Sequence, residues 1–386
     1  MPRHTLPTRS SPVITTRRAF SLIELLTVIF IIALMIAILL PALGAVRSSG
    51  RQASTKALLA GLNQAAGQFE LDNRRQPGYF DADQIGSTTN FSAGGGAGLT
   101  YMENALLDLS GGDAISVGTP ADTTGWIEVN PTGDAASAIW VKPDLIGVGE
   151  DAYFLPSAEN LAYMSDTQQP GTINDQAVGE ATGLPDLTDP FGQPILAWIE
   201  NNNGPTSIRE SHQFATENVD DGRALFYWAG NGSMLSSPSL GEQGQDMTAN
   251  PVPGQIGSLI GQGALNSGGH EAIEGVMAAL LGHPGYPDEA FLNGFDYDNI
   301  YPKRPRGSFV AHSAGPDGVY LGAADRRLSR VVPGDALGGG SFNITYGVNF
   351  FNTAMPSSAD DRRKGENSQP ITTDFLEGFD DLIVAQ

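Results

Sequence analysis

The sequence contains no cysteine among its 386 residues, so disulfides and thiol chemistry are excluded. Histidine is scarce, and the segment His270-Glu271-Ala272-Ile273-Glu274 lacks the second histidine of a zinc protease helix. No phosphate-binding loop occurs, and residues 261–266 lack the strand and terminal glycine of a dinucleotide loop. These absences predict a protein that is not an enzyme, although its many serines and aspartates leave a hidden catalytic triad open.

Positive charge is also scarce after the first 76 residues. Residues 1–76 carry nine Lys/Arg against three Asp/Glu, whereas residues 77–386 carry twelve against forty, and the whole chain has a formal net charge of -22. An acidic excess of this size repels polyanions, so the composition argues against a nucleic-acid partner. The 48 glycines and 25 prolines predict long loops without indicating disorder throughout.

One apolar run stands out against this composition. Residues 25–46 contain no charge, and at about 1.5 Å per residue they are long enough to cross a hydrocarbon core of roughly 30 Å. Their apolar side chains outweigh Glu24 at the edge, so membrane insertion is expected. A secretory signal peptide is the alternative, but its apolar region is only about 7 to 15 residues long.

The residues around the start of this run carry a family resemblance. Arg17-Arg18-Ala19-Phe20-Ser21-Leu22-Ile23-Glu24-Leu25-Leu26-Thr27-Val28-Ile29 resembles the cleavage signal of type IV pilins and type II secretion pseudopilins. The resemblance implies that a prepilin peptidase cuts between Ala19 and Phe20 and methylates the new amine, with Ala19 in the place of the usual glycine. A twin-arginine export signal at Arg17-Arg18 is a rival, although a small-residue cleavage site after the run is poor.

Two further residues fit the same resemblance. A carboxylate at the hydrocarbon edge is costly unless it is paired, and the resemblance implies that Glu24 pairs with the new amine of Phe20 in a neighbouring subunit. The alternative is a boundary glutamate that reaches the lipid headgroups. Pro41 stands at the distance from Phe20 where many pilins have a proline, and it removes one backbone hydrogen bond from the helix.

The helical pattern continues beyond the apolar run. Apolar residues recur at steps of three and four, which predicts one helix from Phe20 to about Asp72 that Pro77 and Gly78 end. The predicted apolar face comprises Val46, Ala53, Ala57, Leu58, Leu62, Ala65, Ala66 and Phe69. The expected organisation is a leader at 1–19, a transmembrane helix at 20–46, an amphipathic continuation at 47–76 and a globular domain at 77–386, with insertions at about 80–185 and 231–300.

The globular domain shows short apolar segments between glycine- and proline-rich stretches. Helices are expected at 103–109 and 271–281, and strands at 126–129, 138–141, 195–199, 224–229, 308–312, 319–321 and 343–350. The fold class is therefore α+β: a long N-terminal transmembrane and amphipathic helix packs on a small antiparallel sheet with long insertions, which is the pilin-like plan.

Two loops resemble those of major pseudopilins. Asp189-Pro190-Phe191-Gly192-Gln193-Pro194 is similar to their Asp-Pro-Trp-Gly-x-Pro loop, and Pro190, Gly192 and Pro194 predict a rigid structural turn that begins at Asp189. Residues 313–318 and 379–383 resemble the start and end of their calcium loop. The resemblance implies calcium ligands at Asp317, Asp380 and Asp381; a solvated acidic loop is the alternative.

The sequence as a whole therefore predicts a structural subunit of a type II secretion or type IV pilus-like filament. The expected protein crosses the inner membrane once and has most of its chain in the periplasm or another extracytoplasmic space. Its expected partners are prepilin peptidase, other pilin-like subunits in a homo- or hetero-polymer, an inner-membrane assembly platform and membrane lipid. The alternatives are a membrane-anchored extracytoplasmic binding protein and an anchored hydrolase.

Overall fold

The structure is a computed structural model that describes only part of the chain. The described residues are 22–79, 101–111, 113–115, 118–129, 139–142, 146, 152–162, 185–200, 213–214, 226–227, 280–284, 302, 304–321, 376 and 379–386. The chain divides into two compact units, Met1–Gly50 and Arg51–Gln386. The predicted strand at 343–350 and most of the predicted helix at 271–281 lie outside the described residues.

The first element is helix α1, which spans Leu22–Asn73 and agrees with the predicted end near Asp72. The helix ends because Arg74 adopts a positive φ of 56° and donates its N–H to the carbonyl of Glu70 at 2.7 Å, a left-handed C-cap. Pro77 and Gly78, which were expected to end it, follow three and four residues later.

The second half of α1 forms one side of the core of the unit Arg51–Gln386. Its buried stripe comprises Thr55, Leu59, Leu62, Asn63, Ala65, Ala66 and Phe69. The predicted face was wrong at its start, because Val46, Ala53 and Ala57 are exposed. Thr55 takes their place in the stripe because its hydroxyl donates to the carbonyl of Arg51 at 3.0 Å, which satisfies the polar atom inside the helix.

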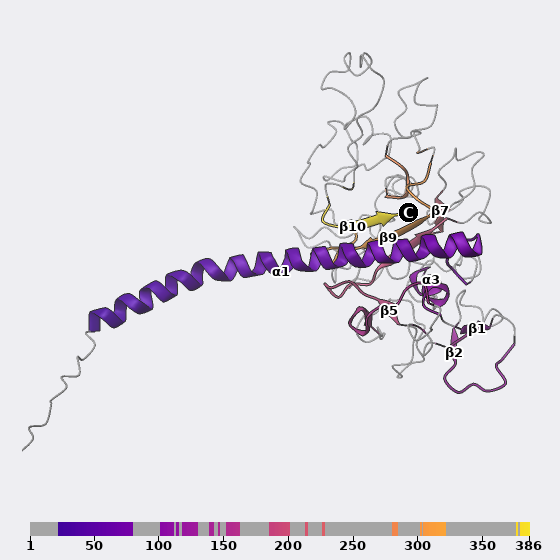
Figure 1. Ribbon diagram of the computed structural model, residues 1–386, viewed down its shortest axis with the longest axis horizontal. Helices are drawn as coiled ribbons and strands as arrows, with labels where there is room; N and C mark the ends of the chain where they lie inside the picture. Colours follow the sequence, from indigo (N-terminus) through magenta and orange to yellow (C-terminus); the bar gives the residue numbers. More distant parts are fainter. Residues whose placement is uncertain are drawn as a thin grey trace, which may run out of the picture. The chain divides into compact units, whose positions relative to one another are not determined.

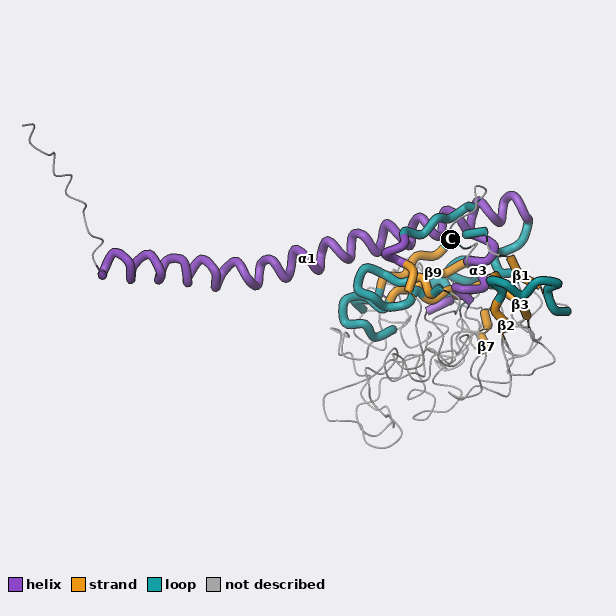
Figure 2. Tube along the Cα trace, turned by 90° about the horizontal axis from the view of Figure 1, so that it is seen from below, coloured by secondary structure: helices purple, strands orange, loops and turns teal. Residues whose placement is uncertain are grey.

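The central sheet packs against this stripe. Its order is β10-β9-β6, with β6 at Leu196–Ile199, β9 at Phe309–Ser313 and β10 at Leu382–Ala385, all antiparallel. Figures 1 and 2 both show β9 beside the second half of α1, and Figure 1 also shows β10 there. All of β9 is buried, and its residues Phe309 and Ala311 belong to the same core cluster as the buried stripe of α1.

Helix α3, Tyr101–Leu109, completes the core between α1 and β6. A hydrogen-bonded ion pair joins it to the end of α1: both terminal nitrogens of Arg75 donate to the carboxylate of Asp108, at 2.6 and 2.9 Å. The N–H of Gly78 donates to the same carboxylate at 2.7 Å. The turn after α1 is therefore held by a side chain of the next helix.

The remaining strands form small antiparallel sheets. One has the order β1-β3-β2, with β1 at Asp113–Ile115, β2 at Ile127–Val129 and β3 at Ile139–Lys142. The others pair β4, Leu161–Ala162, with β5, Asp186–Leu187, and β7, Gln213–Phe214, with β8, Phe226–Tyr227; a short 3-10 helix, Ala158–Asn160, precedes β4. A long N-terminal apolar helix with small antiparallel sheets is compatible with the predicted α+β class.

Two elements differ from the sequence-based expectation. Residues 319–321 were predicted as a strand but form a turn, because the carboxylate of Asp317 captures the N–H of Val319 at 2.8 Å and Leu321 adopts a positive φ of 47°. Strand β10 was not predicted, since residues 379–383 resemble the end of a calcium loop. It pairs with β9 over four residue pairs.

Candidate functional site

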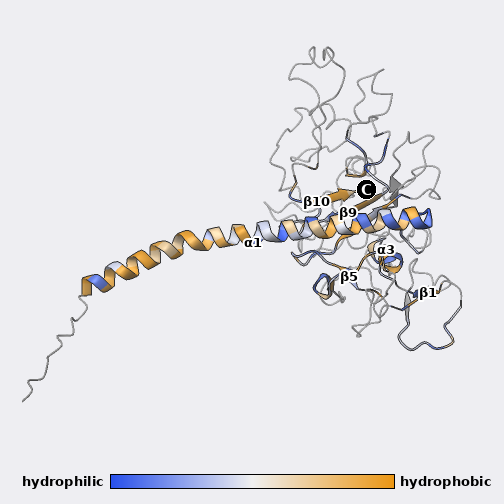
Figure 3. Cartoon of the chain, in the orientation of Figure 1, coloured by the Kyte–Doolittle hydropathy of each residue, from blue (hydrophilic) through white to orange (hydrophobic). Residues whose placement is uncertain are grey.

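The first half of α1 presents an apolar surface. Its large apolar side chains between Leu22 and Val46 are 47–81% exposed. Figure 3 shows that this half is coloured as hydrophobic along most of its length, whereas hydrophilic and hydrophobic residues alternate in the second half. Within the described residues, α1 is the one helix long and apolar enough to cross a membrane, which is consistent with a single-pass anchor.

The predicted assembly residues lie on this half of α1. Glu24 is exposed in the first turn of the helix, and its carbonyl accepts a hydrogen bond from the Thr27 hydroxyl at 2.9 Å. Pro41 lies inside α1, and helical structure continues on both sides of it. The predicted cleavage residues Ala19 and Phe20 lie outside the described residues.

The segment Asp189–Pro194 forms a tight turn directly before β6. One carboxylate oxygen of Asp189, Oδ1, accepts the N–H groups of Phe191 at 2.9 Å and Gln193 at 3.0 Å. The carbonyl of Asp189 accepts the N–H of Gly192 at 2.9 Å, and Gly192 has a φ of 91°. Pro190 occupies the second position of this turn, and Thr188 and Pro194 form a bridge across its base.

The turn is anchored to β9 and to α1. The Ser313 hydroxyl at the end of β9 donates to Asp189 Oδ2 at 2.5 Å, and the guanidinium of Arg51 lies 5.9 Å from the centre of the Phe191 ring. Burial raises the pKa of Asp189, while the hydrogen bonds from Ser313 and the turn N–H groups act to lower it. The net effect of this environment is therefore a carboxyl that holds its proton more tightly than a free aspartate.

The two segments of the predicted calcium loop lie side by side, although 60 residues separate them in the sequence. Leu382 pairs with Ser313 across β10 and β9. Gly315 has a φ of 71° and approaches the chain at Asp380 so closely that a Cβ there would lie 2.4 Å from the Asp380 carbonyl oxygen. The backbone itself therefore brings residues 313–318 against residues 379–381.

A buried histidine, which the sequence analysis did not single out, lies where these segments meet. His312 Nε2 lies 2.6 Å from Asp381 Oδ1, and both side chains have no exposed surface. The N–H of Leu321 donates to the same oxygen at 2.9 Å. The His312 ring also packs edge-on against Tyr320, at 5.3 Å between ring centres, and the Tyr320 hydroxyl donates to the Pro194 carbonyl. One cluster thus joins the turn, β9 and the start of β10.

The hydrogen bonds of His312 define its protonation state. Its Nδ1 atom is buried and has no hydrogen-bond partner within the described part of the chain, so a proton there would be an unsatisfied buried donor. Nε2 is then the protonated nitrogen, and the neutral ring donates to Asp381. Burial accordingly lowers the pKa of His312 to about 3.

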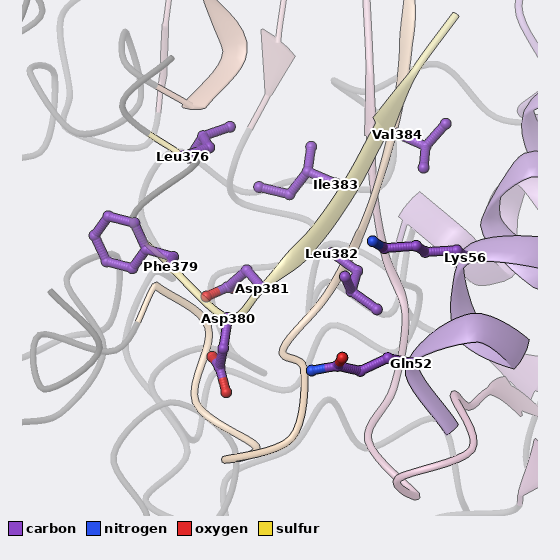
Figure 4. Close-up of a pocket in the computed structure, with 9 residues that line it drawn as sticks. All are labelled: Gln52, Lys56, Leu376, Phe379, Asp380, Asp381, Leu382, Ile383 and Val384. Carbon is purple, nitrogen blue, oxygen red and sulfur yellow. The ribbon is translucent and has the colours of Figure 1, made fainter. Parts of the chain in front are cut away.

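Two of the three predicted calcium ligands, Asp381 and Asp317, accept hydrogen bonds in this arrangement. Asp381 accepts the hydrogen bonds just described, and Asp317 is half-buried and accepts the N–H of Val319. Figure 4 shows the carboxylates of Asp380 and Asp381 leaving the chain in different directions. Across the residues that the structure describes, no three acidic or histidine side chains converge in a metal-binding group. Calcium binding stays a prediction.

A groove of about 540 Å³ opens beside this cluster. Its lining comes from α1, from residues 376–381 and from β10: Gln52, Lys56, Leu376, Phe379, Asp380, Asp381, Leu382, Ile383 and Val384. Figure 4 shows Gln52 and Lys56 extending from α1 toward the strand. Both charge signs are present, and apolar side chains separate them.

The described residues do not form a catalytic triad at the buried cluster. His312 and Ser313 are neighbours on β9, and their side chains bind different carboxylates, Asp381 and Asp189. A serine nucleophile needs its hydroxyl within hydrogen-bond reach of its base, whereas here the hydroxyl donates to a carboxylate of the turn. In the described residues, these hydrogen bonds hold β9 to the turn at Asp189 and to Asp381.

Comparisons with known proteins identify no relative. No protein-family model, no curated protein and no solved structure matches this chain.

Proposed function

We propose that this chain is a structural subunit, a pseudopilin, of a type II secretion or type IV pilus-like filament. It enters the inner membrane through α1, prepilin peptidase cuts and N-methylates it before Phe20, and it polymerises through the same helix. The bulk of the chain lies in the periplasm or another extracytoplasmic space. Its partners are other pilin-like subunits and an inner-membrane assembly platform.

The observation that carries this proposal is the division of α1 into two halves of different character. Between Leu22 and Val46 the apolar side chains are exposed, whereas from Leu59 onward one stripe is buried in the core of the unit Arg51–Gln386. Exposed apolar surface of this extent is unfavourable in water, so another apolar phase must cover it. Lipid covers it before assembly, and helices of neighbouring subunits replace the lipid in a filament.

Glu24 supports the assembly step in the proposal. It is the one acidic residue between Leu22 and Val46, and a carboxylate at a hydrocarbon edge is stabilised by a cationic partner. Cleavage before Phe20 would create such a cation four residues earlier in the chain. Because the two groups are near each other in sequence, a neighbouring subunit shifted along the filament axis can bring its amine to this carboxylate.

The first experiment is mass spectrometry of the mature protein from membranes. The proposal expects an N-methylated Phe20 as the terminal residue. Ala19→Gly should be processed at least as fully as the natural sequence, because both residues are small. Ala19→Leu should accumulate as the uncut precursor. An intact Met1 in the natural protein would refute the proposal and favour a membrane-anchored binding protein.

The second experiment separates assembly from insertion by varying Glu24. Glu24→Gln removes the charge at nearly constant size, and Glu24→Asp keeps the charge. The proposal expects all variants in the membrane fraction at natural levels, with filament incorporation lost in Glu24→Gln and partly kept in Glu24→Asp. Cross-linking between subunits measures incorporation. Equal incorporation of Glu24→Gln and the natural protein would count against the pairing.

A further inference from the structure

The contact between residues 313–321 and residues 379–381 surrounds a buried charged group. Residues 313–321 and 379–381 come together at a buried carboxylate, Asp381, which carries no exposed surface. A buried carboxylate must be balanced by cations or by hydrogen-bond donors, because its desolvation is costly. The resemblance noted in the sequence suggests a calcium ion for this role.

We propose that the neutral His312 ring and the Leu321 N–H, and not a bound cation, bind Asp381 Oδ1, so that residues 313–321 and 379–381 are held together by protein donors and the stability of this contact does not depend on calcium. The observation behind this is the donor pair on one oxygen: His312 Nε2 at 2.6 Å and the Leu321 N–H at 2.9 Å. The proposal concerns closure of the fold, goes beyond the proposed function and does not depend on filament assembly.

The geometry around Asp381 disfavours a cation at this oxygen. Two N–H groups direct their positive ends at Oδ1, so a calcium ion bound there at about 2.3–2.6 Å would meet like charge. Calcium also takes oxygen ligands, whereas Asp381 Oδ1 is contacted by an imidazole nitrogen and a backbone N–H. The Ser313 hydroxyl, which is also buried in this cluster, donates to Asp189.

The hydrogen bonds of His312 and Ser313 connect three distant parts of the chain. His312 and Ser313 are adjacent on β9; the first reaches Asp381, 69 residues later, and the second reaches Asp189, 124 residues earlier. Gly315 then allows the loop to lie against the Asp380 backbone. A closure between segments so far apart in sequence requires a fixed contact, and this pair supplies one inside the protein.

The test compares His312→Gln and His312→Leu in the full-length chain in detergent. A glutamine amide nitrogen can occupy the position of Nε2 and donate to Asp381, whereas leucine has similar bulk and no donor. The melting temperature of each protein is measured in millimolar calcium and again in excess chelator. The expected result is a natural protein with one melting temperature in both buffers, a loss of roughly 5–10 °C in His312→Leu, and less than half that loss in His312→Gln.

Two results would overturn the proposal. One is a melting temperature of the natural protein that rises by several degrees with calcium and falls with chelator. The other is a His312→Leu variant as stable as the natural protein. If His312→Leu does not fold, the calcium and chelator measurements on the natural protein still decide. Neither measurement involves Phe20 or Glu24, so this test can fail while the proposed function stands.

Discussion

Gly315 and Gly192 form a matched pair of residues in the left-handed region. Their φ angles are 71° and 91°, so any other residue is strained at both positions by about 1 kcal/mol. A Cβ on Gly315 would also lie 2.4 Å from the Asp380 carbonyl oxygen, whereas a Cβ on Gly192 would meet nothing within 4 Å. Substitution of Gly192 therefore measures backbone strain alone, whereas substitution of Gly315 measures backbone strain together with the clash against Asp380.

We expect Gly315→Ala to lower the free energy of unfolding by about 2–4 kcal/mol and Gly192→Ala by only about 1 kcal/mol. The additional loss at position 315 arises because the loop must move away from the Asp380 backbone. Denaturant unfolding of both variants at one pH measures the difference. Equal losses would show that the loop does not contact residue 380 in solution.

Asp189 gives a pH-dependent prediction at the same scale. Burial raises its folded-state pKa above that of an unfolded aspartate, so the folded protein binds this proton at a higher pH than the unfolded chain does. As pH falls from the raised pKa toward about 3.8, Asp189 adds to stability, and this contribution is lost as pH rises back through the same window. Asp189→Asn cannot take up this proton.

The natural protein should therefore gain stability relative to Asp189→Asn on acidification within that window. Asparagine keeps an oxygen for the Phe191 and Gln193 N–H groups, so this variant should form the turn. Asp189→Ala removes both acceptors and should cost about 1–3 kcal/mol at neutral pH. Urea unfolding of the three proteins at a series of pH values measures these differences; parallel pH curves for the natural protein and Asp189→Asn would contradict the raised pKa.

At the scale of elements, the sequence was sufficient to predict the helices and strands whose signal lies in the spacing and type of neighbouring residues. The apolar run and the repeat of three and four residues predicted α1 to within one residue of its end, and the segment 103–109 predicted α3 to within two residues. Strands β6 and β9 were predicted because aromatic and β-branched residues lie between turn residues. These signals depend on neighbours in the sequence.

The elements that were missed depend on distant partners. Strand β10 is a four-residue segment that becomes a strand by pairing with β9, and its apolar run Leu382–Ile383–Val384 was the signal that could have indicated it. His312 was not predicted as a structural residue because its partner Asp381 is 69 residues away. The pair could not be inferred without knowing which strands adjoin.

The junction between α1 and α3 gives the prediction at this scale. Asp108 accepts two hydrogen bonds from Arg75 and one from Gly78, and its side chain is 9% exposed. Asp108→Ala should lower the free energy of unfolding by about 1–3 kcal/mol, because several charge-assisted hydrogen bonds are lost. Asp72→Ala is the control, since this exposed residue near the end of α1 is bound by Gln68 and should cost under about 0.5 kcal/mol.

Thermal or urea unfolding of the two variants measures this difference. The loss in Asp108→Ala should also shrink at high salt, because part of the interaction with Arg75 is screened; the Arg75 side chain is 48% exposed. A loss no larger than that of Asp72→Ala would indicate that the core alone positions α3.

At the scale of the whole molecule, the division at Gly50 and Arg51 predicts which part folds without a membrane. A chain of residues 51–386 keeps the buried stripe of α1, including Leu59 and Leu62, and carries sixteen Lys/Arg against forty-two Asp/Glu, a charge that keeps copies apart. We expect it to be soluble without detergent and to unfold cooperatively.

A chain of residues 63–386 is the control. It loses both leucines, at about 2–5 kcal/mol each, and should aggregate or lose its cooperative transition. Size-exclusion chromatography and circular dichroism measure both outcomes, and an aggregated 51–386 chain would show that the first half of α1 is needed for folding as well as anchoring.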